Sequence, residues 1–156
     1  MKRFLLAAAI VLVASVGAQA QTEKGTWLLG GNTTFQATDG ATIFNASPNI
    51  GYFFSNNLAA GLEASFLSAD GASIYAFGPF IKPYFGKSEK GKFFGKGSFL
   101  LVGGEGDSQA GFGLGAGYAL FLNRSVALEF GANYNKLGEG SGTFGLGVGF
   151  QIHFKK

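Results

Sequence analysis

The chain contains 156 residues, of which 47% are hydrophobic, 15% aromatic and 13% charged, and its formal net charge at pH 7 is +3. Soluble domains usually carry about 25% charged residues, so this composition indicates a surface that partly faces lipid. The chain has no cysteine, which excludes a disulfide framework and a cysteine-ligated metal. Nucleic-acid binding is not expected, because it needs a basic stripe with aromatic residues placed to stack on bases, and the basic residues here are mostly dispersed.

Residues 1–20 have the three parts of a secretory signal peptide. Lys2 and Arg3 form a positive start, an almost unbroken apolar run extends from Phe4 to Val16, and Ala18-Gln19-Ala20 is a small-x-small cleavage site. The apolar run is short for a transmembrane helix. We therefore expect export and cleavage after residue 20, which leaves residues 21–156 as one domain.

Turn-forming Gly, Asn, Asp and Ser residues divide this domain into eight segments, in which apolar residues alternate with small or polar ones. The segments cover residues 26–36, 42–54, 58–68, 73–85, 92–103, 109–122, 125–135 and 144–154. A period of two predicts β-strands with one apolar and one small or polar face. Strands of this length are long enough to cross a bilayer at a tilt.

The last segment shows the alternation most clearly, because every second residue from Phe144 to Phe154 is apolar and the intervening residues are small or polar. The pattern predicts an all-β fold: an eight-stranded antiparallel up-and-down transmembrane β-barrel, with apolar faces toward lipid and small or polar faces toward the lumen. An even number of strands brings both ends of the domain to one side, which for an exported protein is the periplasm.

Aromatic residues gather near the ends of the predicted strands, as expected for the girdles of an outer-membrane barrel. The predicted periplasmic girdle consists of Trp27, Tyr52, Phe54, Tyr84, Phe121 and Phe154. Three prolines oppose the strand prediction, since each removes a hydrogen-bond donor and a closed barrel has no free edge. They are Pro48, Pro79 and Pro83. A β-bulge, or water reaching the ladder, would accommodate them.

Two hairpins and the last strand resemble a known family. Residues 49–62 contain Asn49-Ile50-Gly51-Tyr52-Phe53-Phe54 followed by Asn56-Asn57-Leu58-Ala59-Ala60-Gly61-Leu62. Residues 121–129 are similar to the matching hairpin of the second half, and residues 147–154 to the closing strand. Together they resemble the small outer-membrane β-barrel domain proteins of the OmpX or OmpA type.

The resemblance implies a bacterial outer-membrane location, contact with outer-membrane lipid, and biogenesis by the barrel-assembly machinery. In the closing strand, Phe150, Ile152 and Phe154 match the assembly signal of such proteins. The sequence departs from the pattern at its end, because Lys155 and Lys156 follow the aromatic residue on which many relatives end.

Four ionisable residues fall at inward positions of the predicted barrel: Glu63, Lys82, Lys96 and Glu129. Charges that face hydrocarbon are costly, so we expect these side chains to form a paired polar network in the lumen. The interior of an eight-stranded barrel is just filled by side chains, which predicts a plugged core. The many inward glycines either leave internal space or admit larger side chains from across the lumen.

No motif predicts an enzyme, a cofactor or a metal site. His153 is the only histidine, and no second motif supplies the partners that acid–base catalysis needs. We predict a monomeric outer-membrane protein with a structural, envelope-integrity or surface-interaction role. One alternative is a narrow porin-like channel for ions or very small solutes. A less favoured alternative is a soluble lipocalin-like barrel, whose apolar faces would point inward around an apolar ligand.

Overall fold

The computed structural model describes residues 22–38, 41–69, 72–103, 109–139 and 141–156. The predicted signal peptide and its cleavage site lie outside these residues. Eight strands make up most of the described chain: β1 (Thr26–Thr38), β2 (Ala41–Ser55), β3 (Leu58–Ala69), β4 (Ala72–Phe85), β5 (Gly91–Gly103), β6 (Gln109–Phe121), β7 (Val126–Leu137) and β8 (Thr143–Lys155). Each end lies within two residues of its predicted position, because the turn residues mark where the alternation stops. No helix in the described ranges is long and apolar enough to cross a membrane.

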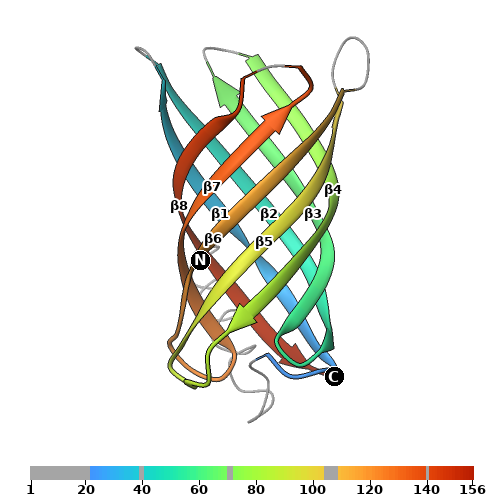
Figure 1. Cartoon of the computed structure of the whole chain (residues 1–156), viewed down its shortest axis with the longest axis vertical. Helices are drawn as coiled ribbons and strands as arrows, with labels where there is room; N and C mark the ends of the chain where they lie inside the picture. The colour runs from blue at the N-terminus through green and yellow to red at the C-terminus, as the bar shows by residue number, and fades with distance from the viewer. Residues whose placement is uncertain (1–21, 39–40, 70–71, 104–108, 140) are drawn as a thin grey trace, which may run out of the picture.

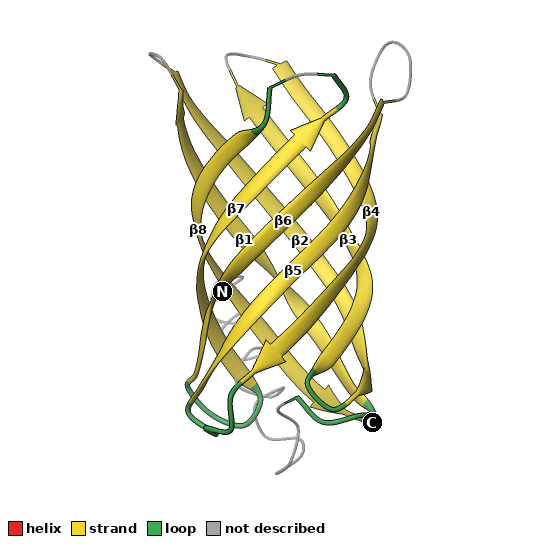
Figure 2. Cartoon of the chain, in the orientation of Figure 1, coloured by secondary structure: helices red, strands yellow, loops and turns green. Residues whose placement is uncertain are grey.

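The strands form a closed barrel in sequence order, and β8 pairs with β1 to complete it (Figure 1 and Figure 2). Every neighbouring pair is antiparallel, so the predicted fold class is confirmed. Thr26 pairs with Lys155, which places both ends of the barrel at the same side. We call this side the terminal end, and the side with the four β1–β2, β3–β4, β5–β6 and β7–β8 connections the loop end.

The alternation sorts side chains to the two faces of the barrel wall as predicted. Leu62 is 62% exposed on the outside, whereas the next residue, Glu63, is 6% exposed on the inside. The same contrast appears in β8, where Leu146 is exposed and Gly147 is buried. The inverted facing that a lipocalin-like barrel requires is therefore not found, and the outer wall is apolar.

Each proline interrupts only one of the two ladders in which its strand takes part. Pro48 stays in register with Gly31 of β1, while the β2–β3 ladder skips residues 47 and 48. Pro79 and Pro83 stay in register with β3, while the β4–β5 ladder skips residues 78–79 and 82–83. A strand residue points its backbone nitrogen toward one neighbour only, so one ladder is spared. The register shift between β2 and β3 lies at Phe53/Ser55, away from Pro48.

Candidate functional site

Apolar side chains fill the terminal half of the lumen. This buried cluster, which we call the plug, comprises Leu28, Phe53, Ala59, Phe80, Tyr84, Phe94, Ala119, Phe121 and Ala127. The fully buried ring of His153 lies at its centre, with centroids 5.4 Å from Phe121, 5.8 Å from Phe53 and 6.3 Å from Tyr84. The plug draws residues from β1 to β7, and His153 comes from β8, so side chains from all eight strands meet in this half of the lumen.

Two residues assigned to the periplasmic girdle belong to the plug instead. Tyr84 is 3% exposed and Phe121 is 7% exposed, so neither reaches the outer surface. The prediction placed them by their position near strand ends. Strand parity decides otherwise, because Tyr84 follows inward Lys82 by two residues and Phe121 follows inward Ala119 by two residues.

The remaining girdle residues lie on the outer wall. Trp27 and Tyr52 are exposed there and pack edge to face with centroids 5.2 Å apart. Phe54 is exposed beside them, and Phe154 pairs in register with Trp27. On β8 the predicted assembly residues Phe150, Ile152 and Phe154 share this outward face, since they alternate with buried Gln151 and His153.

An ion pair is embedded in the plug. Lys82 Nζ lies 2.6 Å from Glu129 Oε2, and both side chains are buried. Tyr84 Oη donates to Glu129 Oε1 at 2.9 Å, and Gln151 Nε2 donates to Oε2 at 3.3 Å. The ammonium group also lies 4.4 Å from the centroid of the Phe94 ring, a cation–π distance. The buried carboxylate thus has three donors.

A second ion pair joins the other two predicted lumen residues, Lys96 and Glu63. The Glu63 side chain is 4% exposed, whereas that of Lys96 is 17% exposed. Lys96 Nζ lies 5.5 Å from the Phe80 ring centroid, at the boundary between the plug and the space above it. The structure therefore places all four predicted residues inside the barrel and joins them as two separate pairs.

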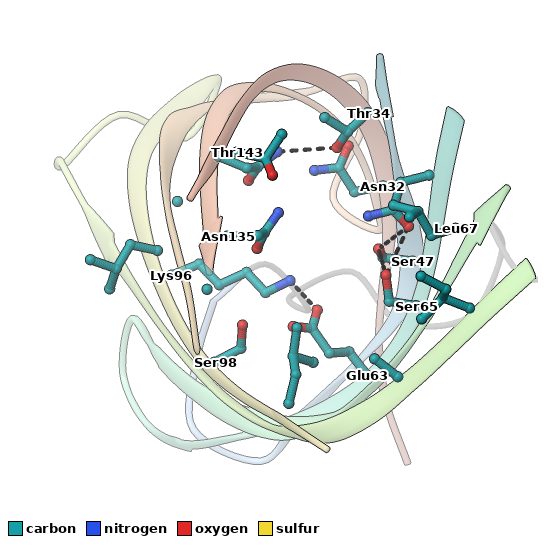
Figure 3. A pocket seen from close by; sticks show the side chains of 18 of the residues that line it. Asn32, Thr34, Ser47, Glu63, Ser65, Leu67, Lys96, Ser98, Asn135 and Thr143 are labelled. Carbon is teal, nitrogen blue, oxygen red and sulfur yellow. Dashed lines mark hydrogen bonds and ion pairs between the residues drawn. The ribbon is translucent and has the colours of Figure 1, made fainter. Parts of the chain in front are cut away.

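The loop half of the lumen contains a polar cavity of about 220 Å³ (Figure 3). Its polar lining consists of Asn32, Thr34, Asn45, Ser47, Glu63, Ser65, Lys96, Ser98, Asn133, Asn135, Ser141 and Thr143. Several of these side chains bond to one another across strands. Ser65 Oγ donates to Asn45 Oδ1 at 2.8 Å, and Asn133 Nδ2 donates to Thr34 Oγ1 at 3.2 Å. Among the described residues of the lining, the only charged side chains are the paired Glu63 and Lys96, which balance each other.

Inward glycines make both halves of the lumen possible. A Cβ added at Gly117 would lie 2.8 Å from Cζ of Phe94, and one added at Gly51 would lie 3.0 Å from Cζ of Phe80. In the loop half, a Cβ at Gly113 would lie 2.7 Å from Asn135 Oδ1. Glycines thus admit aromatic rings from across the lumen in one half, and amide side chains beside a cavity in the other.

Residues 22–25, which we call the strap, lie before β1 at the terminal end. Thr22 is buried, and its Oγ1 donates to Asn57 Oδ1 at 2.6 Å, while Asn57 N donates to the Thr22 carbonyl at 2.7 Å. Lys92 Nζ donates to both side-chain oxygens at 2.6 Å. Asn57 has a φ of 62°, a left-handed conformation that Asn tolerates better than most residues.

The sequence does not predict the strap, because nothing in the local pattern marks Thr22 or Lys92 as partners of a turn about 35 residues away.

The structure defines metal-site and acid–base geometry for the residues that it describes, 22–38, 41–69, 72–103, 109–139 and 141–156. These residues contain no group of three or more His, Asp or Glu side chains that could hold a metal ion. Neither ring nitrogen of His153 has a hydrogen-bond partner among the described residues. An acid–base catalyst needs such a partner within reach and access for a substrate, and the plug provides neither to this histidine.

Comparison with solved structures finds the same fold in proteins of low sequence identity. The N-terminal β-barrel domain of Pseudomonas aeruginosa OprF aligns with a TM-score of 0.66 and 13% identity, covering 84% of this chain and 98% of that domain. Neisserial surface protein A (NspA) aligns with a TM-score of 0.67 and 18% identity, covering 84% and 98%. A de novo designed transmembrane β-barrel aligns with a TM-score of 0.67 and 13% identity, covering 85% and 98%. No protein-family profile and no curated protein sequence matches the chain.

Proposed function

We propose that the chain is a bacterial outer-membrane β-barrel protein that spans the lipid with its apolar outer wall. The strands contain 12 to 15 residues. At about 3.3 Å per residue and a tilt of about 45°, a strand of that length rises about 30 Å, which is the thickness of a hydrocarbon core. A wall this apolar and this tall is suited to lipid and costly in water.

Aromatic pairs at two levels of the outer wall support the same proposal. Near the terminal end, Phe93 and Tyr118 pack with centroids 5.1 Å apart, at a level similar to that of Trp27 and Tyr52. Near the loop end, Phe35 packs against Phe44 at 5.5 Å. Two such bands are expected where the two interfaces of a bilayer meet a barrel.

The terminal end is assigned to the periplasm, because an exported chain whose barrel begins and ends at one side leaves both ends there. In this orientation, the outward aromatic residue Phe154 lies at the periplasmic end of β8, where the assembly machinery would recognise it. The proposed partners are therefore outer-membrane lipid and that machinery, and the protein is proposed to act as a monomer without a cofactor.

The plug carries the proposed role. Apolar rings and the buried Lys82–Glu129 pair occupy the terminal half, which supports the proposal that solute entering the cavity of the loop half is blocked there. We therefore propose a structural, envelope-integrity or surface-interaction role, and not an enzymatic one. A narrow channel remains the second candidate, which the polar cavity of the loop half favours and the plug opposes.

Location and closure are tested together on the full chain expressed in a Gram-negative host. We expect the protein in the outer-membrane fraction, and we expect unboiled samples to migrate differently from boiled ones in SDS gels, because a closed hydrogen-bond ladder resists the detergent. Recovery in the soluble periplasmic fraction, or identical mobility of membrane-inserted protein before and after boiling, would contradict the proposal.

A further inference from the structure

Formal charge is distributed unevenly between the two ends of the barrel. The terminal end carries seven basic and two acidic residues. The basic residues are Lys24, Lys87, Lys90, Lys92, Arg124, Lys155 and Lys156, and the acidic ones are Glu23 and Glu89. The sequence of the loop-end connections and the adjacent strand end contains one basic and five acidic residues. The basic residue is Lys136, and the acidic ones are Asp39, Asp70, Glu105, Asp107 and Glu139. The lumen is balanced by its two ion pairs. The net charge of the chain is modest, but its terminal end is strongly basic.

Five of these lysines are exposed and lie on different parts of the terminal end. Lys24 belongs to the strap, Lys87 and Lys90 to the β4–β5 turn, and Lys155 and Lys156 to the end of β8. In a closed barrel of this strand order, the β4–β5 turn lies across from the junction of β8 and β1. We call these five residues the basic rim, because their amines flank the barrel on opposite sides.

Within the basic rim, Lys155 forms only a long and exposed ion pair. Lys155 Nζ lies 3.9 Å from Glu23 Oε2, and the two side chains are 46% and 56% exposed. A pair this long and this exposed contributes little and exchanges easily with other ions. Lys92 differs from the rim residues, because its amine is turned inward to Thr22 and Asn57.

The aromatic residues of the terminal end fix the depth at which these amines lie. Phe85 and Phe93 are exposed on the outer wall at either side of the β4–β5 turn that carries Lys87 and Lys90. Trp27 lies beside Lys155, whose register partner is Thr26. Aromatic rings of this kind settle at the headgroup level, so lysines just beyond them reach the phosphate layer.

We propose that the basic rim binds the phosphate groups of anionic phospholipids in the leaflet that the terminal end meets. The proposal rests on the membrane insertion proposed above. Lysine ammonium groups are point charges without strict geometry, which suits mobile lipid headgroups better than a fixed small-molecule site. Juxtamembrane clusters of four to eight Lys or Arg residues are the known sequence pattern for attraction to anionic lipid surfaces.

Electron paramagnetic resonance of spin-labelled lipids tests this on the full chain folded into phosphatidylcholine vesicles. Trace spin-labelled phosphatidylglycerol should associate with the barrel about two- to fivefold more strongly than spin-labelled phosphatidylcholine at low salt, as expected for exposed charge pairs. The preference should shrink toward equality in about 1 M salt, where the screening length is about 3 Å. It should also shrink in a variant with Lys24, Lys87, Lys90, Lys155 and Lys156 all replaced by Gln.

The matched control is Lys136→Gln, which removes a lysine from the opposite end and should leave the preference unchanged. Equal association of the two lipids with the wild type at low salt, or an undiminished preference in the five-lysine variant, would overturn the proposal. Displacement of labelled phosphatidylglycerol by water-soluble glycerol phosphate would overturn the assignment to lipid and point to a free anion. If the wild type inserts, as its heat-dependent gel mobility shows, but has no preference, then this inference alone fails. If it does not insert, both proposals fail.

Discussion

Whether the buried ion pair Lys82–Glu129 stabilises the fold depends on the groups that hydrogen-bond to it. Removing two charges from water costs several kcal/mol per ion, and the cost is recovered only when hydrogen bonds complete the site. Here Tyr84 and Gln151 donate hydrogen bonds to the Glu129 carboxylate in addition to Lys82. The Phe94 ring faces the ammonium group. The site is therefore stable as a unit and sensitive to the loss of one member.

We predict that Glu129→Gln destabilises the folded barrel by about 3–5 kcal/mol, because it leaves the ammonium group of Lys82 buried without a counter-charge. Adding Lys82→Met should recover part of this loss, since the charge is removed and the space is still filled. Urea unfolding of the barrel in lipid vesicles measures both values. A double variant no more stable than Glu129→Gln would contradict the pairing.

Glu63→Gln is the matched comparison, because it breaks the other ion pair at the edge of the polar cavity. Lys96 keeps contact with the cavity and can be hydrated there, so the loss should be clearly smaller than for Glu129→Gln. Equal losses at the two sites would mean that the two halves of the lumen do not differ in access to water.

At the scale of single strands, the period of two predicts which substitutions lipid will reject. Val148 lies near the middle of β8 and is exposed on the outer wall. Val148→Arg should cost about 2–4 kcal/mol in the same unfolding assay, because it directs a charge toward the centre of the hydrocarbon. Ser47→Arg directs the same side chain into the cavity of the loop half, beside polar groups, and should cost clearly less than Val148→Arg. Similar losses for both would show that the assigned faces are wrong.

The β4–β5 ladder is predicted to open more readily than its neighbour. Pro79 and Pro83 leave two gaps in it, whereas the β5–β6 ladder pairs without a gap from Gly91 to Val102. Amide hydrogens of β5 that point toward β4 near these gaps should exchange about fivefold faster than those that point toward β6, a factor that corresponds to ~1 kcal/mol of lost hydrogen bonding. Hydrogen exchange of the folded protein measures this. Equal protection along both sides of β5 would contradict the expectation.

The strands can be predicted from the sequence because alternation and turn residues are local properties, contained in each short segment of the chain. The same parity places Glu63, Lys82, Lys96 and Glu129 inside. Which acid pairs with which lysine depends on register around the whole barrel, and a single segment does not contain that information. Tyr84 and Phe121 lie near strand ends, which favours a girdle position, but their parity along the strand turns them inward.

The whole molecule combines an apolar wall, a plugged terminal half and a polar cavity in the loop half. The division of the lumen arises from the size pattern of inward residues. Aromatic rings face glycines in one half, and amides and hydroxyls face glycines in the other. This pattern becomes visible only once the strands are closed into a barrel, which explains why the sequence predicted a filled lumen without its boundary.

Planar-bilayer recording of the full chain tests the central claim, that the plug closes the barrel. The wild type, with insertion confirmed by heat-dependent gel mobility, should show no reproducible single-channel steps. A variant with Phe53→Ala and Phe94→Ala, which removes two rings of the plug, should conduct if it folds, and would thereby show that the assay detects an open lumen. Reproducible steps in the wild type, with an ion selectivity that Glu129→Lys alters, would contradict the account and establish the narrow channel in its place.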